Sequence, residues 1–227
     1  MMAVPNRSRG FSLVEVAVAL LIVGLLLGGL LGSVGALEKR QRAARTEAQL
    51  EEIRDALVAF AIANLRLPCP ANPATPDTVV GAGLENAPTA GGCTGGASGV
   101  LPWATLGLPA GDAWGRRFTY RVSANFSRQA PAFDLASVGD NVVSNAAGVS
   151  LASGIPAVVL SHGENARGSR GPGGAAAPAG VDPREQENAD GDANFTFETP
   201  ADAYDDLVTW VPTPVLAYRM LQAGVLP

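Results

Sequence analysis

An uncharged apolar run from Val16 to Leu37 dictates that this chain begins with a long, lipid-compatible helix. As an α-helix the run is about 33 Å long, which is enough to cross a hydrocarbon core of about 30 Å. Glu15 stands directly before it. A carboxylate inside a bilayer costs roughly 2–4 kcal/mol, and ionisable residues in such segments are functional by default. The sequence therefore predicts a membrane segment in which Glu15 has a specific role.

Two ordinary explanations of this segment leave Glu15 without a role. Arg7 and Arg9 could begin a secretory signal peptide, and residues 33–35 offer a small-residue cleavage site that would leave a mature chain near Ala36. However, the apolar run is longer than the usual 7 to 15 residues of a signal peptide. An uncleaved membrane anchor fits the length but does not use the glutamate. Basic residues flank both ends of the run, so the positive-inside rule does not orient it.

The junction GFSLVE, residues 10–15, indicates a third explanation. A short basic leader ends in glycine, a phenylalanine follows, and a glutamate precedes the apolar helix. This arrangement resembles the N-terminus of type IV pilins and of the pseudopilins of type II secretion. The resemblance implies that residues 1–10 are a leader, that a prepilin peptidase cleaves between Gly10 and Phe11, and that the new Phe11 amine is methylated. It also implies that Glu15 faces the N-terminal amine of a neighbouring subunit, where an ammonium group compensates the carboxylate.

Three glycines in the apolar run, Gly24, Gly28 and Gly32, repeat at the G-x-x-x-G spacing. Glycines at this spacing let helices approach closely in lipid, although each weakens a helix by roughly 1 kcal/mol relative to alanine. We therefore assign residues 11–37 to a transmembrane and polymerisation helix. In this helix, Glu15 and the three glycines are the expected subunit-assembly residues.

Residues 38–67 continue the helix with an amphipathic pattern. Their apolar positions follow the helical period of 3.6, namely Leu50, Ile53, Leu57 and Phe60. Prolines at positions 68 and 70 end the pattern. The sequence predicts one helix from Phe11 to about Asn64, with the apolar stripe of its second half packed against a globular domain.

Residues 68–227 are predicted to form a periplasmic globular head with long loops. The residues between 68 and 100 and between 163 and 193 are rich in turn formers, and residues 214–221 suit a short closing helix. Alternation at 117–122 predicts a strand with one buried face, and further strands are predicted at 155–162, 194–199 and 205–211. Strands that follow one another without clear helices favour an antiparallel sheet. The expected fold class is α+β, with the long helix packed on a small antiparallel sheet as in pilins.

Composition narrows the class of protein. An apolar content of 47% excludes a disordered chain, and a net charge of −5 gives no basic face for nucleic acid. Cys69 and Cys93 are the only cysteines, and a structural zinc site needs more ligands of this kind. In an oxidising compartment the pair is expected to form one disulfide, which constrains the unfolded chain by roughly 3 kcal/mol.

The head contains few candidates for a catalytic or metal site. His162 is the only histidine, its neighbour Ser161 points to the other face of a strand, and no nucleophile elbow accompanies them, so a loop-anchoring or surface histidine is expected. Asp190, Asp192 and Asn194 open like a calcium loop but do not continue as an EF-hand. The resemblance to major pseudopilins implies calcium in the loop before the last strand. The candidate ligands are Asp190, Asp192, Asp205 and Asp206, against the simpler interpretation of a solvated acidic loop.

These observations predict a non-enzymatic, pilin-like structural subunit without an obligatory cofactor. It would have a single pass in the inner membrane and a periplasmic head, and would then enter a type IV pilus or a type II secretion pseudopilus. Long loops suit uniform packing poorly, which favours a minor subunit. The expected partners are prepilin peptidase, other pilin or pseudopilin subunits and an inner-membrane assembly platform. The alternative is a secreted or membrane-anchored periplasmic binding domain that does not assemble into a filament.

Overall fold

The computed structural model describes residues 10, 12–201 and 203–226, with residues 26–34 described by their backbone alone. The chain divides into two compact units, Met1–Gln41 and Arg42–Pro227. The first contains the N-terminal part of one long helix. The second contains the rest of that helix and the head.

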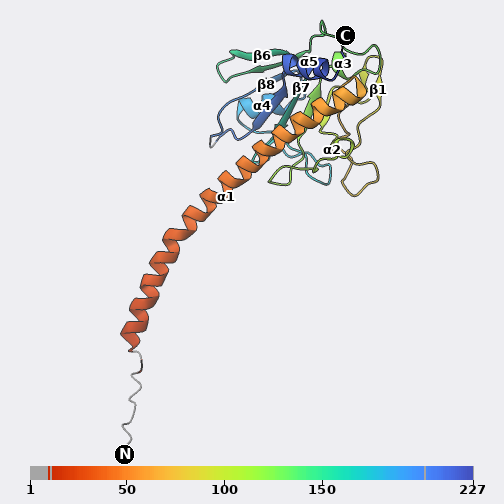
Figure 1. Cartoon of the computed structure of the whole chain (residues 1–227). Coiled ribbons are helices and arrows are strands. Elements are labelled where there is room, and N and C mark those ends of the chain that lie inside the picture. Colours follow the sequence, from red (N-terminus) through yellow and green to blue (C-terminus); the bar gives the residue numbers. More distant parts are fainter. Residues whose placement is uncertain (1–9, 11, 202, 227) are drawn as a thin grey trace, which may run out of the picture. The chain divides into compact units, whose positions relative to one another are not determined.

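The long helix, α1, spans Leu13–Asn64 and has 52 residues (Figure 1). It ends where Leu65 adopts the left-handed backbone conformation, with a φ of 57°, shortly before the two prolines. The predicted helix is thus confirmed from Leu13 onwards, and Phe11 lies outside the described residues. Among the residues that the structure describes, no helix is long and apolar enough to cross a membrane. The predicted membrane segment 11–37 includes Phe11 and the side chains of 26–34, which are outside that description.

The centre of the head is a four-stranded antiparallel sheet in the order β3-β4-β7-β9. Val159 of β7 lies opposite Tyr120 of β4 on one side and opposite Thr209 of β9 on the other. Three of these strands fall inside segments that the sequence predicts as strands, and all are shorter than predicted. The four strands span Ser98–Val100, Thr119–Val122, Ala157–Ser161 and Leu207–Val211.

A second, three-stranded sheet has the order β6-β5-β8. Its strands are β5 (Asn141–Ser144), β6 (Ser150–Ile155) and β8 (Asn194–Thr196). β6 is antiparallel to β5, but β8 is parallel to it. The expectation of purely antiparallel pairing is therefore wrong for β5 and β8. Between β5 and β8 the chain forms β6, β7 and then the helix Pro183–Ala189. Two parallel strands require such a long connection.

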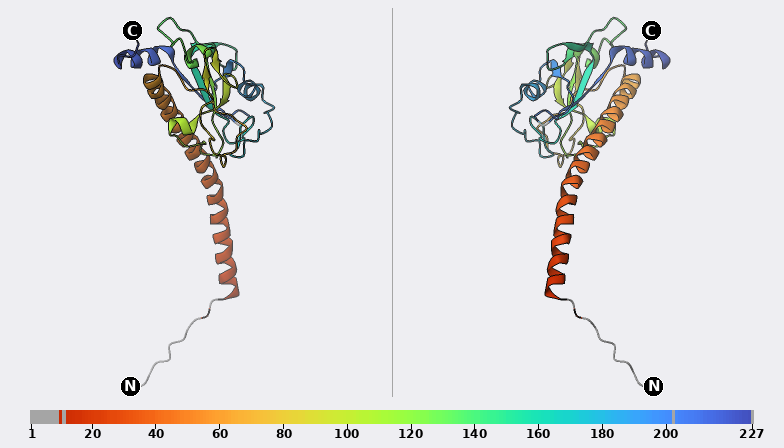
Figure 2. Two further views of the ribbon diagram at one scale, coloured as in Figure 1. Left: turned by 90° about the vertical axis from the view of Figure 1, so that its right-hand side faces the viewer. Right: turned by 90° about the vertical axis from the view of Figure 1, so that its left-hand side faces the viewer.

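The two sheets and two helices form layers around β7 (Figure 2). Tyr120 and Val159 on one face of the first sheet pack with Leu57 of α1 and Met220 of the C-terminal helix. Val158 and Leu160 on the other face pack with Val143 and Phe195 of the second sheet. Because both faces are covered, every residue of β7 is buried. Such a strand has a continuous apolar sequence instead of an alternating one.

Arg117, just before β4, and Arg121, within it, are both buried, which corrects the prediction of a strand with one exposed face. Arg117 donates hydrogen bonds to the carbonyls of Pro73, Thr75 and Pro172 and forms an ion pair with Asp77. It thereby joins the two long loops of the head. A guanidinium group has enough donors to satisfy several acceptors at once, which makes its burial tolerable.

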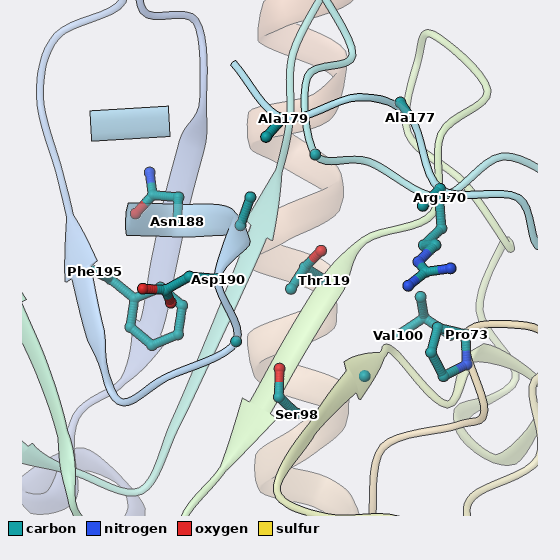
Figure 3. A pocket seen from close by; sticks show the side chains of 15 residues that line it. Pro73, Ser98, Val100, Thr119, Arg170, Ala177, Ala179, Asn188, Asp190 and Phe195 are labelled. Carbon is teal, nitrogen blue, oxygen red and sulfur yellow. The ribbon is translucent and has the colours of Figure 1, made fainter. Parts of the chain in front are cut away.

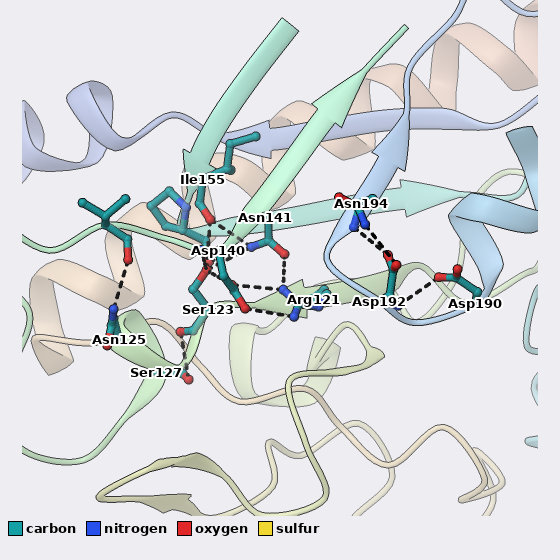
Figure 4. Close-up of polar contacts among 12 residues, drawn as sticks. Arg121, Ser123, Asn125, Ser127, Asp140, Asn141, Ile155, Asp190, Asp192 and Asn194 are labelled. Atoms are coloured by element: carbon teal, nitrogen blue, oxygen red, sulfur yellow. Dashed lines mark hydrogen bonds and ion pairs between the residues drawn. The ribbon is translucent and has the colours of Figure 1, made fainter. Parts of the chain in front are cut away.

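Arg121 is the second buried arginine, and it forms a compact polar network (Figure 4). It donates to both carboxylate oxygens of Asp140, at 3.1 and 3.0 Å, and to Asn141. Ser123 also donates to Asp140, and Asn141 donates to the carbonyl of Ile155 at 2.9 Å. The network fastens β4 to the start of β5, so it links the two sheets.

The remaining elements are short. They are β1 (Pro88–Thr89), β2 (Gly92–Cys93), α2 (Trp103–Leu106), α3 (Ala124–Ser127), α4 (Pro183–Ala189) and α5 (Thr213–Gln222). α5 confirms the predicted closing helix. α4 lies inside the segment 163–193 predicted as loop; Asp182 caps its N-terminus by accepting a hydrogen bond from the Arg184 amide. The expected disulfide is present, because Cys69 and Cys93 are bonded.

Candidate functional site

The described part of the chain begins with a reciprocal pair of hydrogen bonds around the first turn of α1. The Ser12 hydroxyl accepts a bond from the Glu15 amide at 3.2 Å, and the Glu15 carboxylate accepts one from the Ser12 amide at 3.0 Å. This is the capping box of an S-x-x-E sequence, which satisfies two amides that the helix cannot pair internally. The S-x-x-E pattern is visible in the sequence, although the role predicted for Glu15 did not include this cap.

The capping box fixes the place of the Glu15 carboxylate. It lies at the N-terminal end of the helix, beside the amide of Ser12 and therefore close along the chain to the predicted cleavage point between Gly10 and Phe11. The partial positive charge of a helix N-terminus favours a carboxylate there. A carboxylate has room for several donors, so capping leaves Glu15 able to accept a further, cationic partner.

The apolar side chains that follow are exposed in the isolated chain. Leu20 and Leu21 are about two-thirds exposed, and Leu25 is 71% exposed. A Cβ atom added at Gly24 would meet nothing within 4 Å, whereas Gly28 and Gly32 lie where side-chain surroundings are not described. A helix with apolar residues on every side needs a cover of lipid or of other helices. Close helix contact at the three glycines stays a prediction.

Comparison with known families assigns this N-terminal segment. Residues 5–31 match the model of the prokaryotic N-terminal methylation motif. The chain carries the type IV pilin and pseudopilin signature. The motif implies a pilin-like subunit that is processed by a prepilin peptidase, is anchored in a membrane and then assembles with other pilin subunits. No curated protein and no solved structure matches the chain.

The methylation motif covers the leader and the start of α1, so the head has to be interpreted from its own geometry. Of the predicted calcium ligands, Asp190 and Asp192 hold their own turn together. Asp190 accepts a bond from the Asp192 amide at 2.9 Å, and Asp192 accepts two from Asn194 (Figure 4). These oxygens support the approach to β8.

The other two predicted ligands, Asp205 and Asp206, lie in a different carboxylate group. They meet Glu185 of α4, and one ligand atom from each of the three residues lies within 4.8 Å of the others. Among the described residues, one oxygen of Asp205 and one of Asp206 are buried without a hydrogen-bond partner. The pKa of Asp205 is raised to about 6, chiefly by burial and also by the charges of Glu185 and Asp206, against an opposing hydrogen bond from the Asn165 amide.

Oxygen-rich groups of this kind suit hard cations such as calcium. Calcium, if bound, would therefore be held by Glu185 of α4 and by Asp205 and Asp206, which directly precede β9. It would supply the positive charge that the group lacks. Glu185 was not among the predicted ligands, since a glutamate in a segment rich in glycine and proline has no periodic pattern to mark it. Asp190 and Asp192 are not part of this carboxylate group, so the structure does not bring the four predicted ligands together.

His162 is fully buried and not at the surface, which corrects one of its two expected placements. Its Nε2 lies 2.9 Å from the Thr119 hydroxyl, and its Nδ1 lies 3.6 Å from a carboxylate oxygen of Asp206. The second distance is longer than a hydrogen bond. Asp206 also accepts a bond from Asn188 of α4 at 2.8 Å. The histidine thus connects β4 with the carboxylate group.

Thr119, which contacts this histidine, also lines a pocket of about 310 Å³ (Figure 3). Ser98 and Thr119 come from the first sheet, Arg170 and Pro73 lie on one side, and Asp190 lies on the other. The Arg170 guanidinium donates to the carbonyl of Gly174, so it braces the loop that forms one wall. Small side chains and backbone make up most of the remaining lining.

Proposed function

We propose that this chain is a non-enzymatic, pilin-like structural subunit of a type IV pilus or a type II secretion pseudopilus. One observation carries the proposal: the methylation motif at residues 5–31 leads directly into a helix of 52 residues that starts with the capped Glu15. A cleavable leader placed before an apolar helix leaves that helix on the mature protein. This arrangement serves assembly through the helix.

The proposed processing creates the partner that Glu15 needs. Cleavage between Gly10 and Phe11 would release the Phe11 amine, which is then methylated. In the low dielectric of a bilayer or of a helix bundle, an isolated carboxylate is costly and a carboxylate beside an ammonium group is compensated. Glu15 of one subunit would pair with the Phe11 amine of its neighbour. The cost of the unpaired glutamate in the free subunit would thus favour its addition to a filament.

The head fits a place outside the cytoplasm. Disulfides such as Cys69–Cys93 persist in oxidising compartments and are rare in the cytosol. The proposal therefore has the N-terminal helix in the inner membrane before assembly and the head in the periplasm. The long irregular segments of the head, which pack uniformly with difficulty, support a minor position in the filament.

A glutamate substitution tests this mechanism. We expect Glu15→Ala to be processed and retained in membranes like the original chain but to enter filaments at a level reduced about tenfold, since a charge pair in low dielectric is lost. Glu52→Ala, an exposed glutamate on the same helix, is the matched control and should assemble normally. The measurement is the amount of chain in sheared filaments relative to the amount in membranes. Normal incorporation of Glu15→Ala would contradict the proposal.

A further inference from the structure

β9 is an edge strand of the first sheet, because the order β3-β4-β7-β9 gives it only β7 as a neighbour. In an antiparallel sheet, hydrogen-bonded pairs of residues alternate with pairs that are not bonded. The Ser123 amide donates to the Pro156 carbonyl at 2.8 Å, and this pair continues the register between β4 and β7. The alternation therefore directs the peptide groups of Val158 and Leu160 at β4, and those of Val159 at β9.

The same alternation identifies the groups of β9 that have no partner in the sheet. Val159 lies opposite Thr209, so the peptide groups of Thr209 bond to β7. The peptide groups of Val208 and Trp210 must then face away from β7. Within the described part of the chain, neither residue forms a backbone hydrogen bond with a segment outside the sheet. Their amides and carbonyls are thus open at this edge, at the two-residue spacing of a strand.

The open edge lies in a groove between two walls. The groove has a volume of about 350 Å³ and is lined by Leu50 and its neighbours on α1, by residues 197–200 and by residues 206–209. The side chain of Phe197 is 40% exposed and packs edge-on against Trp210, with ring centroids 5.8 Å apart. Because walls flank the edge on both sides, a single extended segment can reach it more easily than the sheet of another folded domain.

The charges around the groove set a further condition on what it binds. Glu47 and Glu51 are exposed on α1, and Glu198 also lines the groove. The lining also contains a cation, Arg54, which lies three positions after Glu51 on the helix and can offset that one glutamate. The lining therefore stays acidic as a whole, and it disfavours a segment that carries carboxylates of its own.

We propose that β9 receives an extended segment of a partner protein, which adds to the first sheet as a fifth strand. The segment has apolar side chains at every second position and no acidic residue. Its backbone bonds to Val208 and Trp210, its apolar side chains lie against Phe197, and the side chains between them lie beside α1. A second copy of this chain is a poorer donor, because its described strands are already paired. The inference goes beyond the proposed function and does not depend on filament assembly.

Amide hydrogen exchange tests the added strand at single residues. The probe is a six-residue peptide in which valine alternates with threonine and lysine, with both ends blocked, added to the full chain in detergent. We expect the amides of Val208 and Trp210 to exchange about tenfold more slowly at saturating peptide, measured by NMR. The amide of Thr209 already bonds to β7 and should change little. Unchanged exchange at Val208 and Trp210 up to millimolar peptide, or slowing at β6 instead, would overturn the inference.

Two N-methylated peptides separate backbone pairing from simple apolar contact. One carries N-methyl groups on its valines and the other on the residues between them, so each peptide has one blocked edge. One of the two should lose binding and the other should keep it, because only one edge of the added strand pairs with β9. Equal binding by both peptides, or equal loss, would contradict strand addition.

A variant of the groove wall provides the last measurement. Phe197→Ala should weaken binding of the unmethylated peptide about three- to tenfold, since an apolar contact is removed. Leu151→Ala is the matched control and should bind like the original, because Leu151 is 48% exposed on β6, an edge strand of the second sheet. The same loss in both variants would contradict the assigned edge. These measurements do not involve filaments, so this inference and the proposed function can fail separately.

Discussion

Glu15 combines two roles at the scale of a single residue. In the isolated chain its carboxylate closes the first turn of α1 together with Ser12. In the proposed filament the same carboxylate meets the amine of a neighbour. Ser12 therefore orients Glu15, because the cap holds the carboxylate at the N-terminal end of the helix before a neighbour arrives.

Loss of the Ser12 hydroxyl tests this orientation. Ser12→Ala should weaken the first turn by about 1 kcal/mol, since a capping oxygen is removed. The amide of Glu15 should then exchange its hydrogen about fivefold faster, measured by hydrogen–deuterium exchange on the full chain in detergent. Ser12→Thr keeps the oxygen and should behave like the original. Equal exchange in the alanine and threonine variants would show that the capping box does not hold the turn.

Asp140 is the second residue whose charge matters. Burial tends to raise the pKa of Asp140, but hydrogen bonds from Arg121 and Ser123 outweigh it and lower the pKa below its usual value. A carboxyl group with a lowered pKa stabilises the fold fully above its unfolded pKa of about 4. The contribution is lost as the pH falls through the lower, folded pKa.

Asp140→Asn should consequently lower the free energy of unfolding by about 1 kcal/mol at pH 7, a modest value because the carboxylate is 55% exposed. The difference from the original chain should shrink at pH 3, where the carboxyl group is already protonated in the unfolded chain. Chemical unfolding of the full chain in detergent measures both values. Asp134→Asn, an exposed carboxylate bonded only within its own turn, is the control. A deficit that is the same at both pH values would refute the ionic explanation.

At the scale of elements, the carboxylate group joins α4 to the start of β9. A cation there would bind the folded head and not the unfolded chain, which stabilises the fold by about 2.7 kcal/mol at a concentration one hundred times the dissociation constant. Calcium should therefore raise the unfolding temperature, and EDTA should reverse the effect. Asp205→Asn should abolish the rise, whereas Asp192→Asn should keep it, since Asp192 only supports its turn. A rise that depends on Asp192 would place the cation at the other loop.

The disulfide acts on the loop that precedes the first sheet. Its two cysteines are separated by 24 positions, and closing a loop of that length stabilises a fold by roughly 3 kcal/mol through the unfolded chain. Replacing Cys69 and Cys93 together by serine should lower the free energy of unfolding by about that amount, measured by urea denaturation. The double replacement avoids a reactive single thiol. An unchanged free energy of unfolding would mean that the other contacts of this loop, such as those of Arg117, are enough to hold it.

Sequence patterns predicted the elements whose signal is long or local. A sustained helical period predicted α1, and alternation predicted β4. The disulfide was predictable because Cys69 and Cys93 are the only cysteines in the sequence. β5 and β6 lie in a stretch of weak apolar content that predicted no strand. β8 falls inside the strand predicted at 194–199, but its parallel partner β5 lies about 50 positions earlier, so no local pattern predicts their pairing. Arg117 and Arg121 predicted an exposed face because their burial depends on acceptors supplied by distant loops. The carboxylate group was not predicted for the same reason, because Glu185 is distant in sequence from Asp205 and Asp206 and meets them only in the folded head.

At the scale of the whole molecule, the two units have different roles in the proposed function. The unit Met1–Gln41 carries the methylation motif and the exposed apolar helix. The unit Arg42–Pro227 supplies a disulfide-bonded head with two sheets. Processing would then be encoded by Gly10 and Phe11, and assembly by Glu15 in the first turn of α1.

The most direct test of this account is the N-terminus of the mature protein. Intact-mass and N-terminal peptide mass spectrometry should be applied to chain purified from membranes of a host that carries a prepilin peptidase. The account predicts a mature chain that begins with N-methylated Phe11. A chain that begins at Met1 would indicate an uncleaved anchor, and one that begins near Ala36 would indicate an ordinary signal peptide. Either of these two results would contradict the assembly mechanism.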